Sequence, residues 1–415
     1  MGKKVISQLY NPYALKWGEI IDIPTTRSVK EYGNRIYNRY PARSVFLVPR
    51  AILNSRPKGQ NVLDPFMGSG TTAVEAILAG DHPFGTEMDP FARKVASVSV
   101  DIFTKEELVE LEENFQKIAD NWASFEPEEI PDLTGIERWF NDGDLQSLLR
   151  LKACIFKMSD MKFLSFMLIV LADCIKPVSR MERQSTKPYI SSKFPKKTKS
   201  VKDSFCYSFK VHFDAIKEMS SFTNYEKNSG IVWLGNDATN FSCKRNSIDI
   251  AITSPPYINA FDYTQCIKVE SSLCGFLTNK DVTKLKQIQV GQSSRRFQQA
   301  DNVVFETFKP YYDKLVAIDK LSADTCLGFF SDIFKNLCCV HEALKDNGEY
   351  HVIIGDSYIK KTPIPSHDII ASLAGKIGYK WFGYYQYFIK DHRTSIPRDH
   401  DTSKIKTEHV IMLRK

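Results

Sequence analysis

The sequence predicts an α/β fold: a doubly wound, Rossmann-like sheet interrupted by a helical, basic insertion. Three observations support this prediction. Short apolar runs alternate with stretches of helical periodicity in the first and last parts of the chain, which is the pattern of repeated βαβ units. A Gly-rich turn, DPFMGSGTT, joins the first apolar run to its helix. Residues 101–230 lack the alternation and contain acidic helical stretches followed by a basic segment.

The part before the insertion contains the front half of a βαβ unit. RYPAR introduces a predicted helix, SVFLVPRAIL, and residues 61–63 begin a strand that enters the Gly-rich turn. The apolar positions of TTAVEAILA recur at helical spacing, and HPFGTEMD follows as a second strand. The insertion then begins with an acidic helix, KEELVELEENFQKIADNW, and includes the apolar helix FLSFMLIVLA.

The alternation resumes after the insertion. GIVWLGNDATNF and SIDIAITSPPY contain predicted strands, and they are followed by a helix, LGFFSDIFKNLCCVHEALKDNG, and a strand, EYHVIIGDS. HDIIASLAGKIG is a further helix, and WFGYYQYFI and EHVIMLRK are the closing strands. We therefore predict three regions, covering residues 1–100, 101–230 and 231–415.

Composition and charge restrict the class of protein. The 415 residues include 56 Lys and Arg against 49 Asp and Glu, which gives a net charge of +7. This charge allows a basic groove but is too small for polyanion binding by bulk charge alone.

Nine cysteines without a CxxC pair, and an N-terminus without an apolar signal core, predict a reducing, cytoplasmic location. FLSFMLIVLA is about half of a membrane span, so no membrane association is expected. Cys338, Cys339 and His341 share one predicted helix and cannot all reach one ion, so no metal is predicted.

The Gly-rich turn lies where an open α/β sheet binds its ligand, between a strand and the next helix. Alone it also fits a purely structural turn or a nucleotide site, although no Lys follows Gly68 and Gly70 as a P-loop requires. Asp64 opens the turn, and its charge would repel phosphate but suits a cationic, amino-acid-bearing ligand. Glu87 follows the second strand, where a carboxylate can accept hydrogen bonds from ribose hydroxyls, unless it is only a solvated charge. Sulfonium, amino group and ribose together describe S-adenosylmethionine.

DPFMGSGTT, GTEMD and TSPPY, with RYPAR upstream, resemble the motif set of S-adenosylmethionine-dependent DNA methyltransferases that modify exocyclic amines. The resemblance covers residues 36–95 and 230–415, and it implies a Rossmann-like methyltransferase sheet. GNDATNF departs from the family's GDA-like stretch because Asn236 separates its Gly from its Asp. The resemblance implies that S-adenosylmethionine is bound by Tyr40, Pro41, Ala42, Asp64, Pro65, Phe66, Met67, Gly68, Ser69, Gly70, Thr71, Thr72, Glu87, Met88, Asp237 and Ala238.

TSPPY ends a predicted buried strand in a rigid turn, which by itself also fits a simple turn with a packed tyrosine. An exocyclic amine is a poor nucleophile because its lone pair is delocalised into the ring, so it must be held and its hydrogens accepted. The Ser254 hydroxyl and the Pro255 carbonyl can accept them, and Pro256 completes the rigid turn. Tyr257 can stack on the target base, which must first be flipped out of a duplex.

The target amine is predicted from one side chain. The family has Asp at the position of Ser254 in most adenine-N6 enzymes and Ser in most cytosine-N4 enzymes, so the sequence favours cytosine-N4, with adenine-N6 as the alternative. No Pro-Cys pair is present for attack at carbon 5 of cytosine. Relatives that act on RNA or on protein glutamine carry Asn or Asp before Pro-Pro-Tyr, and a nucleotide-binding regulator would leave TSPPY unexplained.

The family reads its target sequence with a variable segment. No recognition domain follows the last predicted strand, so residues 101–230 are the candidate, helped by 264–325, while 1–100 and 231–415 would hold the cofactor-binding and catalytic halves. Two basic stretches are candidate contacts to double-stranded DNA, although such runs are often only solvated surface: Arg180, Arg183, Lys187, Lys196, Lys197 and Lys199, and then Arg295 and Arg296. The resemblance also implies a prokaryotic, DNA-associated protein that can belong to a restriction-modification system with a cognate endonuclease.

Overall fold

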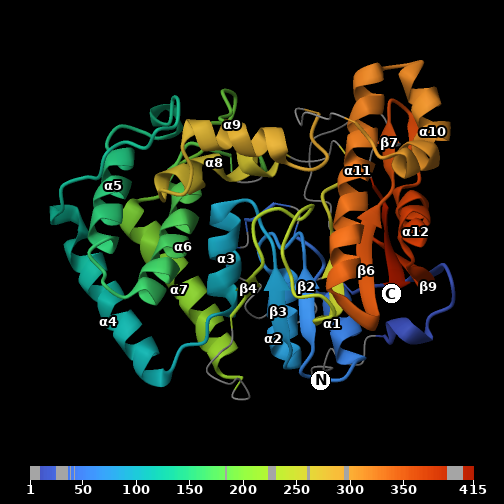
Figure 1. Ribbon diagram of the computed structural model, residues 1–415. Coiled ribbons are helices and arrows are strands. Elements are labelled where there is room, and N and C mark those ends of the chain that lie inside the picture. The colour runs from blue at the N-terminus through green and yellow to red at the C-terminus, as the bar shows by residue number, and fades with distance from the viewer. Residues whose placement is uncertain are drawn as a thin grey trace.

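The computed structural model describes residues 10–24, 36–37, 39–41, 43–182, 185–222, 230–258, 262–293, 299–389 and 405–415. Within these ranges an eight-stranded sheet has the order β1-β9-β10-β6-β5-β2-β3-β4 (Figure 1). In chain order its strands are β1 (Glu19–Ile21), β2 (Asn61–Asp64), β3 (His82–Gly85), β4 (Val232–Trp233), β5 (Ile248–Thr253), β6 (Leu344–Gly355), β9 (Lys380–Phe388) and β10 (Thr407–Arg414).

The sheet is doubly wound around β2. The chain runs from β2 outward to β3 and β4 on one side, and then returns to β5 and β6 on the other. These strands are parallel, whereas β10 is antiparallel to both β6 and β9. The boundary between β2 and β5 is therefore the topological switch point, where open α/β sheets bind ligands at the carboxyl ends of the strands. The predicted fold class is confirmed.

Glycines determine how the first helix leaves the sheet. Helix α2 (Thr71–Ala79) begins after Gly70, whose φ is 87°, and ends at Gly80, whose φ is 84°. A Cβ at Gly70 would lie 2.9 Å from the Cα of Ala96 in α3 (Pro90–Val100), so only glycine fits between these two helices. The sharp turn places the backbone after β2 at the edge of the sheet.

Helices cover both faces of the sheet, as a doubly wound fold requires. Helices α1 (Leu47–Asn54) and α2 pack on one face, together with apolar residues of β9 and β10. The other face is covered by α10 (Asn302–Val316), α11 (Lys320–Ala343) and α12 (Ser366–Ile377). A buried ion pair joins α1 to α2, in which Arg50 Nη2 donates to Glu75 Oε1 over 2.7 Å.

The inserted segment forms a helical lobe beside the sheet (Figure 1). Its helices are α4 (Lys105–Asn121), α5 (Asp144–Ile155), α6 (Met161–Val178) and α7 (Val201–Ser220). FLSFMLIVLA lies within α6, which packs against α3, α7 and α8 (Tyr263–Leu273) in one large apolar cluster. None of the described helices is both long enough and apolar enough to span a bilayer.

The sequence pattern did not indicate several short or polar elements. Strand β1 has three residues, two of them exposed, at the edge of the sheet. Helix α9 (Asn279–Ile288) buries only Val282 and Leu285, so its periodicity is weak. The hairpin of β7 (Ser357–Ile359) and β8 (Thr362–Ile364) is equally short. Helices α8 and α9 cross from the helical lobe toward the carboxyl edge of the sheet (Figure 1), and this position brings them over the candidate site.

Candidate active site

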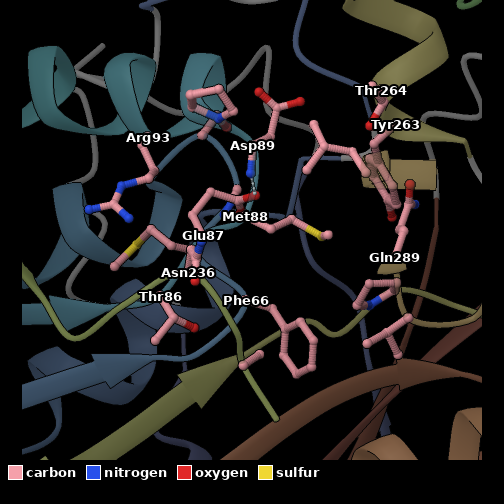
Figure 2. Close-up of a pocket in the computed structure, with 18 of the residues that line it drawn as sticks. Phe66, Thr86, Glu87, Met88, Asp89, Arg93, Asn236, Tyr263, Thr264 and Gln289 are labelled. Atoms are coloured by element: carbon pink, nitrogen blue, oxygen red, sulfur yellow. Dashed lines mark hydrogen bonds between the residues drawn. The ribbon is translucent and has the colours of Figure 1, made fainter. Parts of the chain in front are cut away.

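A cavity of about 1000 Å³ opens at the carboxyl ends of β2, β3 and β5. The turns after these strands form one side of it, and α8, α9 and the segment after α9 form the opposite side (Figure 2). Of the residues that the sequence predicts for cofactor binding, the lining includes Tyr40, Asp64, Pro65, Phe66, Met67, Gly68, Ser69, Thr71, Glu87, Met88, Asp237 and Ala238. Pro41, Gly70 and Thr72 are buried or packed behind it, and Ala42 lies outside the described residues.

Glu87 connects the turns that follow β2 and β3. Its Oε2 accepts a hydrogen bond from the Gly68 N–H over 2.8 Å, and its Oε1 accepts one from the Asp89 N–H over 2.9 Å. Burial raises the pKa of Glu87 to about 7. Each carboxylate oxygen has a second lone pair, so Glu87 can still accept hydrogen bonds from ligand hydroxyls.

Asp64 lies at the end of β2 and is 4% exposed. Its Oδ1 accepts hydrogen bonds from the Thr253 hydroxyl over 2.6 Å and from the Phe66 N–H over 3.0 Å. Burial raises the pKa of Asp64 to about 6, and these hydrogen bonds oppose the rise. Asp64 therefore joins the Gly-rich turn to the residue that precedes Ser254.

Asp89 is a third carboxylate of the cavity, which the sequence analysis missed. Its Oδ1 caps α3 by accepting from the N–H groups of Phe91 and Ala92, and burial raises its pKa to about 6. Its Oδ2 is buried and has no hydrogen-bond partner among the described residues. The signal that could have identified it is the Asp-Pro pair, since Asp is favoured at the N-cap and Pro at the first helical position.

Asp237 and its neighbours lie at the rim of the cavity, on the loop after β4. Asp237 is exposed, and its Oδ1 accepts hydrogen bonds from the N–H and the hydroxyl of Thr239, each over 2.8 Å. The inserted Asn236 lines the same cavity, and in Figure 2 the Phe66 ring projects below it. The extra residue in GNDATNF thus lies in the loop without removing Asp237 from the lining.

The TSPPY turn follows β5 and reaches the same cavity. Ser254 and Pro256 are among the lining residues, whereas Pro255 is buried behind them. Tyr257 is partly buried, and its hydroxyl donates a hydrogen bond to Oε1 of Glu408 on β10. The structure therefore brings Ser254 together with the predicted cofactor residues and ties Tyr257 to a strand that is distant in sequence.

The far side of the cavity consists of residues that the sequence analysis did not select. They come from α8, α9 and the segment that follows, and Tyr263, Thr264 and Gln289 are visible in Figure 2. Further members are Phe276, Leu277, Asp281, Lys284, Leu285, Gln287, Ile288 and Val290. No motif marks them, because a polar helix that covers a pocket has the same composition as a solvated one.

The basic candidates for DNA contact have different surroundings. Arg180, Lys187, Lys197 and Lys199 are exposed, whereas the Lys196 ammonium donates to the carbonyls of Lys176 and Met181 and so holds its own segment. Arg183, Arg295 and Arg296 lie outside the described residues. Three exposed aromatic side chains accompany the lysines: Tyr189, Phe194 and Tyr207, which are 54%, 79% and 62% exposed.

One cluster among the described residues has the side-chain types of a metal site: Asp356, His367 and His409. His367 Nδ1 lies 2.8 Å from Asp356 Oδ1, and the two imidazole rings stack with centroids 4.0 Å apart and planes 3° from parallel. A ring nitrogen binds a metal in the plane of its ring at about 2.0–2.1 Å, so two parallel stacked rings cannot share one ion. We interpret the cluster as hydrogen-bonded.

Comparison with known proteins agrees with the motifs. Residues 12–97 match a family model described as DNA methylase. Over 414 residues the chain is 22% identical to the Type II methyltransferase M.MvaI of Kocuria varians, which covers 93% of this chain and 90% of that protein. It is 23% identical over 259 residues to the Type II methyltransferase M.BsoBI of Geobacillus stearothermophilus, which covers 56% of this chain and half of that protein.

A solved TehB-like SAM-dependent methyltransferase from Corynebacterium glutamicum superposes on 93% of this chain, and 89% of its own chain is covered. Its identity is 9% and its TM-score only 0.29, so this likeness adds nothing to the argument. The family match has more weight because its segment contains the Gly-rich turn and three carboxylates of the cavity, Asp64, Glu87 and Asp89. The family model and the two Type II methyltransferase relatives together support the S-adenosylmethionine-dependent DNA amino-methyltransferase family for this chain.

Proposed function

We propose that this protein transfers a methyl group from S-adenosylmethionine to the exocyclic N4 amine of a cytosine flipped out of duplex DNA. The observation that carries the proposal is the position of Ser254, which lines one cavity together with Asp64 and Glu87. A hydroxyl acceptor for an amine and carboxylates for a cationic, ribose-bearing donor thereby share one space. Adenine-N6 is the second candidate, because a Ser hydroxyl can accept hydrogen bonds from either amine.

The side chains fit the methyl donor chemically. When bound, S-adenosylmethionine supplies an activated methyl group on a positively charged sulfonium. Glu87 would accept hydrogen bonds from ribose hydroxyls, and the turn from Asp64 to Gly70 would hold the methionine end. Asp237 would accept from the adenine amine, and the Phe66 ring offers a flat apolar surface for the adenine. Buried carboxylates favour a cation or a hydroxyl-rich ligand over a phosphate.

TSPPY would act on the target base by positioning it. The Ser254 hydroxyl and the Pro255 carbonyl would accept the two amine hydrogens, which holds the nitrogen and favours its conversion toward tetrahedral geometry. The Tyr257 ring would stack on the base, since base–aromatic stacking contributes about 1–3 kcal/mol per base. No covalent bond to the protein is required, so the contribution of these residues is orientation.

Two side chains make this assignment testable by substitution. Ser254→Ala and Tyr257→Ala should each lower turnover strongly while leaving cofactor affinity nearly unchanged, because neither residue is assigned to the cofactor. Ser55→Ala, at an exposed serine after α1 and outside both the cavity and the helical lobe, is the matched control. Equal losses of cofactor binding and turnover would contradict these roles.

The substrate is tested by methyl transfer from labelled donor to duplex DNA, RNA and protein. We expect label on DNA alone, and mass spectrometry of the digested nucleosides should show N4-methylcytosine. Methyl on adenine would overturn the cytosine assignment and keep the mechanism, whereas label on RNA alone would overturn the DNA assignment. Both relatives are named Type II methyltransferases, and we propose the same role here, with a cognate restriction endonuclease that acts at the same DNA sequence.

The helical lobe would contact the DNA backbone next to the cavity. Burial raises the pKa of the Cys266 thiol on α8, and Lys187 lies near enough to oppose that rise. Because α8 also supplies Tyr263 and Thr264 to the cavity lining, this part of the basic segment lies close to the cavity. Exposed lysines can neutralise phosphates, and exposed rings such as Phe194 can pack against unstacked bases. The prediction that residues 101–230 read the target sequence rests on this proximity.

A further inference from the structure

We propose that Glu408 is a positioning residue for methyl transfer, whose carboxylate fixes the Tyr257 ring against the flipped target base. This inference rests on the proposed function and adds a residue that lies in none of the family motifs described above. Tyr257 Oη donates to Glu408 Oε1, and Tyr387 Oη donates to Glu408 Oε2. Each oxygen of the Glu408 carboxylate therefore accepts one hydrogen bond from a tyrosine hydroxyl.

The strands around Glu408 make it a rigid support. Glu408 lies on β10, where its backbone pairs with Gly355 of β6 on one side and with Tyr387 of β9 on the other. Glu408 and Tyr387 are therefore direct cross-strand partners, and their side chains lie on the same face of the sheet. A group held by paired strands defines a position more sharply than a loop does.

Tyr257 needs such a support because its own backbone lies beyond the end of β5. Strand β5 ends at Thr253, four residues before Tyr257. Gly291 lies close against the backbone of Tyr257, since a Cβ at Gly291 would lie 2.7 Å from the Tyr257 carbonyl oxygen. Gly291 thus restrains the main chain, and Glu408 restrains the ring through its hydroxyl.

The protonation states suit this role. Burial, followed by the nearby Glu408 carboxylate, raises the pKa of Tyr257 well above its ordinary value, so the phenol stays protonated and remains a donor. Burial raises the pKa of Glu408, while the hydrogen bonds from Tyr257 and Tyr387 lower it. Each phenol bonds to a different oxygen of Glu408, so the two hydrogen bonds together fix the orientation of this one side chain.

Glu408 is separate from the cofactor residues. It is absent from the lining of the cavity that contains Asp64 and Glu87. A substitution at Glu408 should therefore alter the positioning of the target base and leave the affinity for S-adenosylmethionine unchanged. This separation distinguishes a positioning role from a general loss of the active site.

The test is a double-mutant cycle between Glu408→Gln and Tyr257→Phe, measured on a duplex that contains the methylated site. Glu408→Gln keeps the shape of the side chain, and Tyr257→Phe keeps the ring but removes the donor. We expect each single variant to lose about tenfold in kcat, with KM for DNA changed less, because one buried hydrogen bond that positions the Tyr257 ring is lost. The double variant should lose little more than either single one, since the two changes remove the same bond.

Two further measurements accompany the cycle. Calorimetry should show wild-type affinity for S-adenosylmethionine in each variant, and a fluorescent cytosine analogue at the target position should be less quenched in Glu408→Gln than in wild type. Tyr384→Phe is the matched control, because this β9 tyrosine bonds to His409 Nδ1 over 2.7 Å and not to Glu408, and we expect wild-type kcat. Thermal unfolding checks that every variant is folded.

The outcomes separate this inference from the proposed function. If wild type methylates DNA but Glu408→Gln has the same kcat, the positioning role is wrong and the proposed function stands. Additive losses in the double variant would also overturn the role, because the two residues would then act independently. If wild type methylates no DNA, both the proposed function and this inference fail.

Discussion

The Thr253 hydroxyl donates a 2.6 Å hydrogen bond to Oδ1 of Asp64 and joins the ends of two neighbouring parallel strands. Asp64 begins the Gly-rich turn after β2, and Thr253 is the last residue of β5, directly before Ser254. The Gly-rich turn and the TSPPY turn therefore share one buried contact at the switch point of the sheet. A change that displaces one turn should therefore displace the other as well.

Thr253→Val should weaken this connection. The variant keeps the size of the side chain but removes the donor, so the buried Asp64 carboxylate loses a partner, and stability should fall by about 1–3 kcal/mol. Cofactor affinity should fall as well, because the turn after β2 is less firmly held. Urea unfolding and calorimetry measure the two effects. Thr253→Ser, which keeps the hydroxyl, is the control, and equal behaviour of both variants would contradict the role of the hydrogen bond.

Cofactor binding should depend on pH through Glu87. Burial raises the pKa of Glu87 from its ordinary 4.5 to about 7, so the free protein holds a proton there below pH 7. The ionised carboxylate is the better acceptor for ribose hydroxyls, and affinity should therefore rise as pH increases from about 6 to 8. Calorimetry on wild type and Glu87→Gln checks this: the variant should bind more weakly at pH 8 and show a flatter pH profile. An unchanged profile in Glu87→Gln would remove Glu87 from the cofactor site.

The basic segment of the helical lobe predicts a salt-dependent interaction with DNA. Changing Lys187, Lys197 and Lys199 together to Gln should weaken DNA binding and reduce the slope of log K against log salt by about 0.9 for each phosphate that the variant no longer neutralises. Lys196 is left unchanged because its ammonium supports the segment from within. Changing three exposed lysines outside the helical lobe, Lys58, Lys314 and Lys376, to Gln is the control. A slope equal to that of wild type would show that this stretch is only solvated surface.

A charge network around the buried Glu349 of β6 should contribute to stability. Glu349 accepts hydrogen bonds from Tyr13 over 2.8 Å, from Arg56 over 2.6 Å and from Arg414 over 2.8 Å, and His351 lies beside it. Removal of one member of such a network leaves buried charges unpaired, and Glu349→Gln should cost about 3–5 kcal/mol of unfolding free energy. Chemical denaturation measures this loss.

The same network predicts a pH dependence. The pKa of Glu349 is lowered from 4.5 to about 2, since its hydrogen bonds to and charge interactions with His351, Arg56 and Arg414 together outweigh the opposing effect of burial. A lowered pKa contributes stability that is complete above about pH 4.5 and is lost as pH falls toward 2. Between these pH values wild type should lose more stability than Glu349→Gln. Equal losses in the two proteins would mean that Glu349 does not stabilise the fold through its charge.

The local sequence was sufficient to predict the turns after β2 and β5, which form one side of the cavity. DPFMGSGTT, with Gly70 at a positive φ, forms its turn from the requirements of its own backbone, and Glu87 follows the adjacent strand. The TSPPY turn is similarly determined by two prolines after a buried strand. Such features depend on neighbours in the chain, and for this reason the fold class and the strand-end side of the cavity lining could be predicted from residue patterns.

Only the tertiary structure shows which residues face these turns. Glu408 reaches Tyr257 across 151 positions of sequence because β10 is inserted between β6 and β9, and nothing in EHVIMLRK marks that glutamate. Helix α9 covers the cavity although its sequence is that of an ordinary polar helix, and Lys196 is turned inward although its neighbours are exposed. Contacts of this kind depend on strand order, strand pairing and helix packing, and the periodicity of a sequence does not specify these. The geometry of a turn and the buried face of a strand, in contrast, are determined by the residues of that segment.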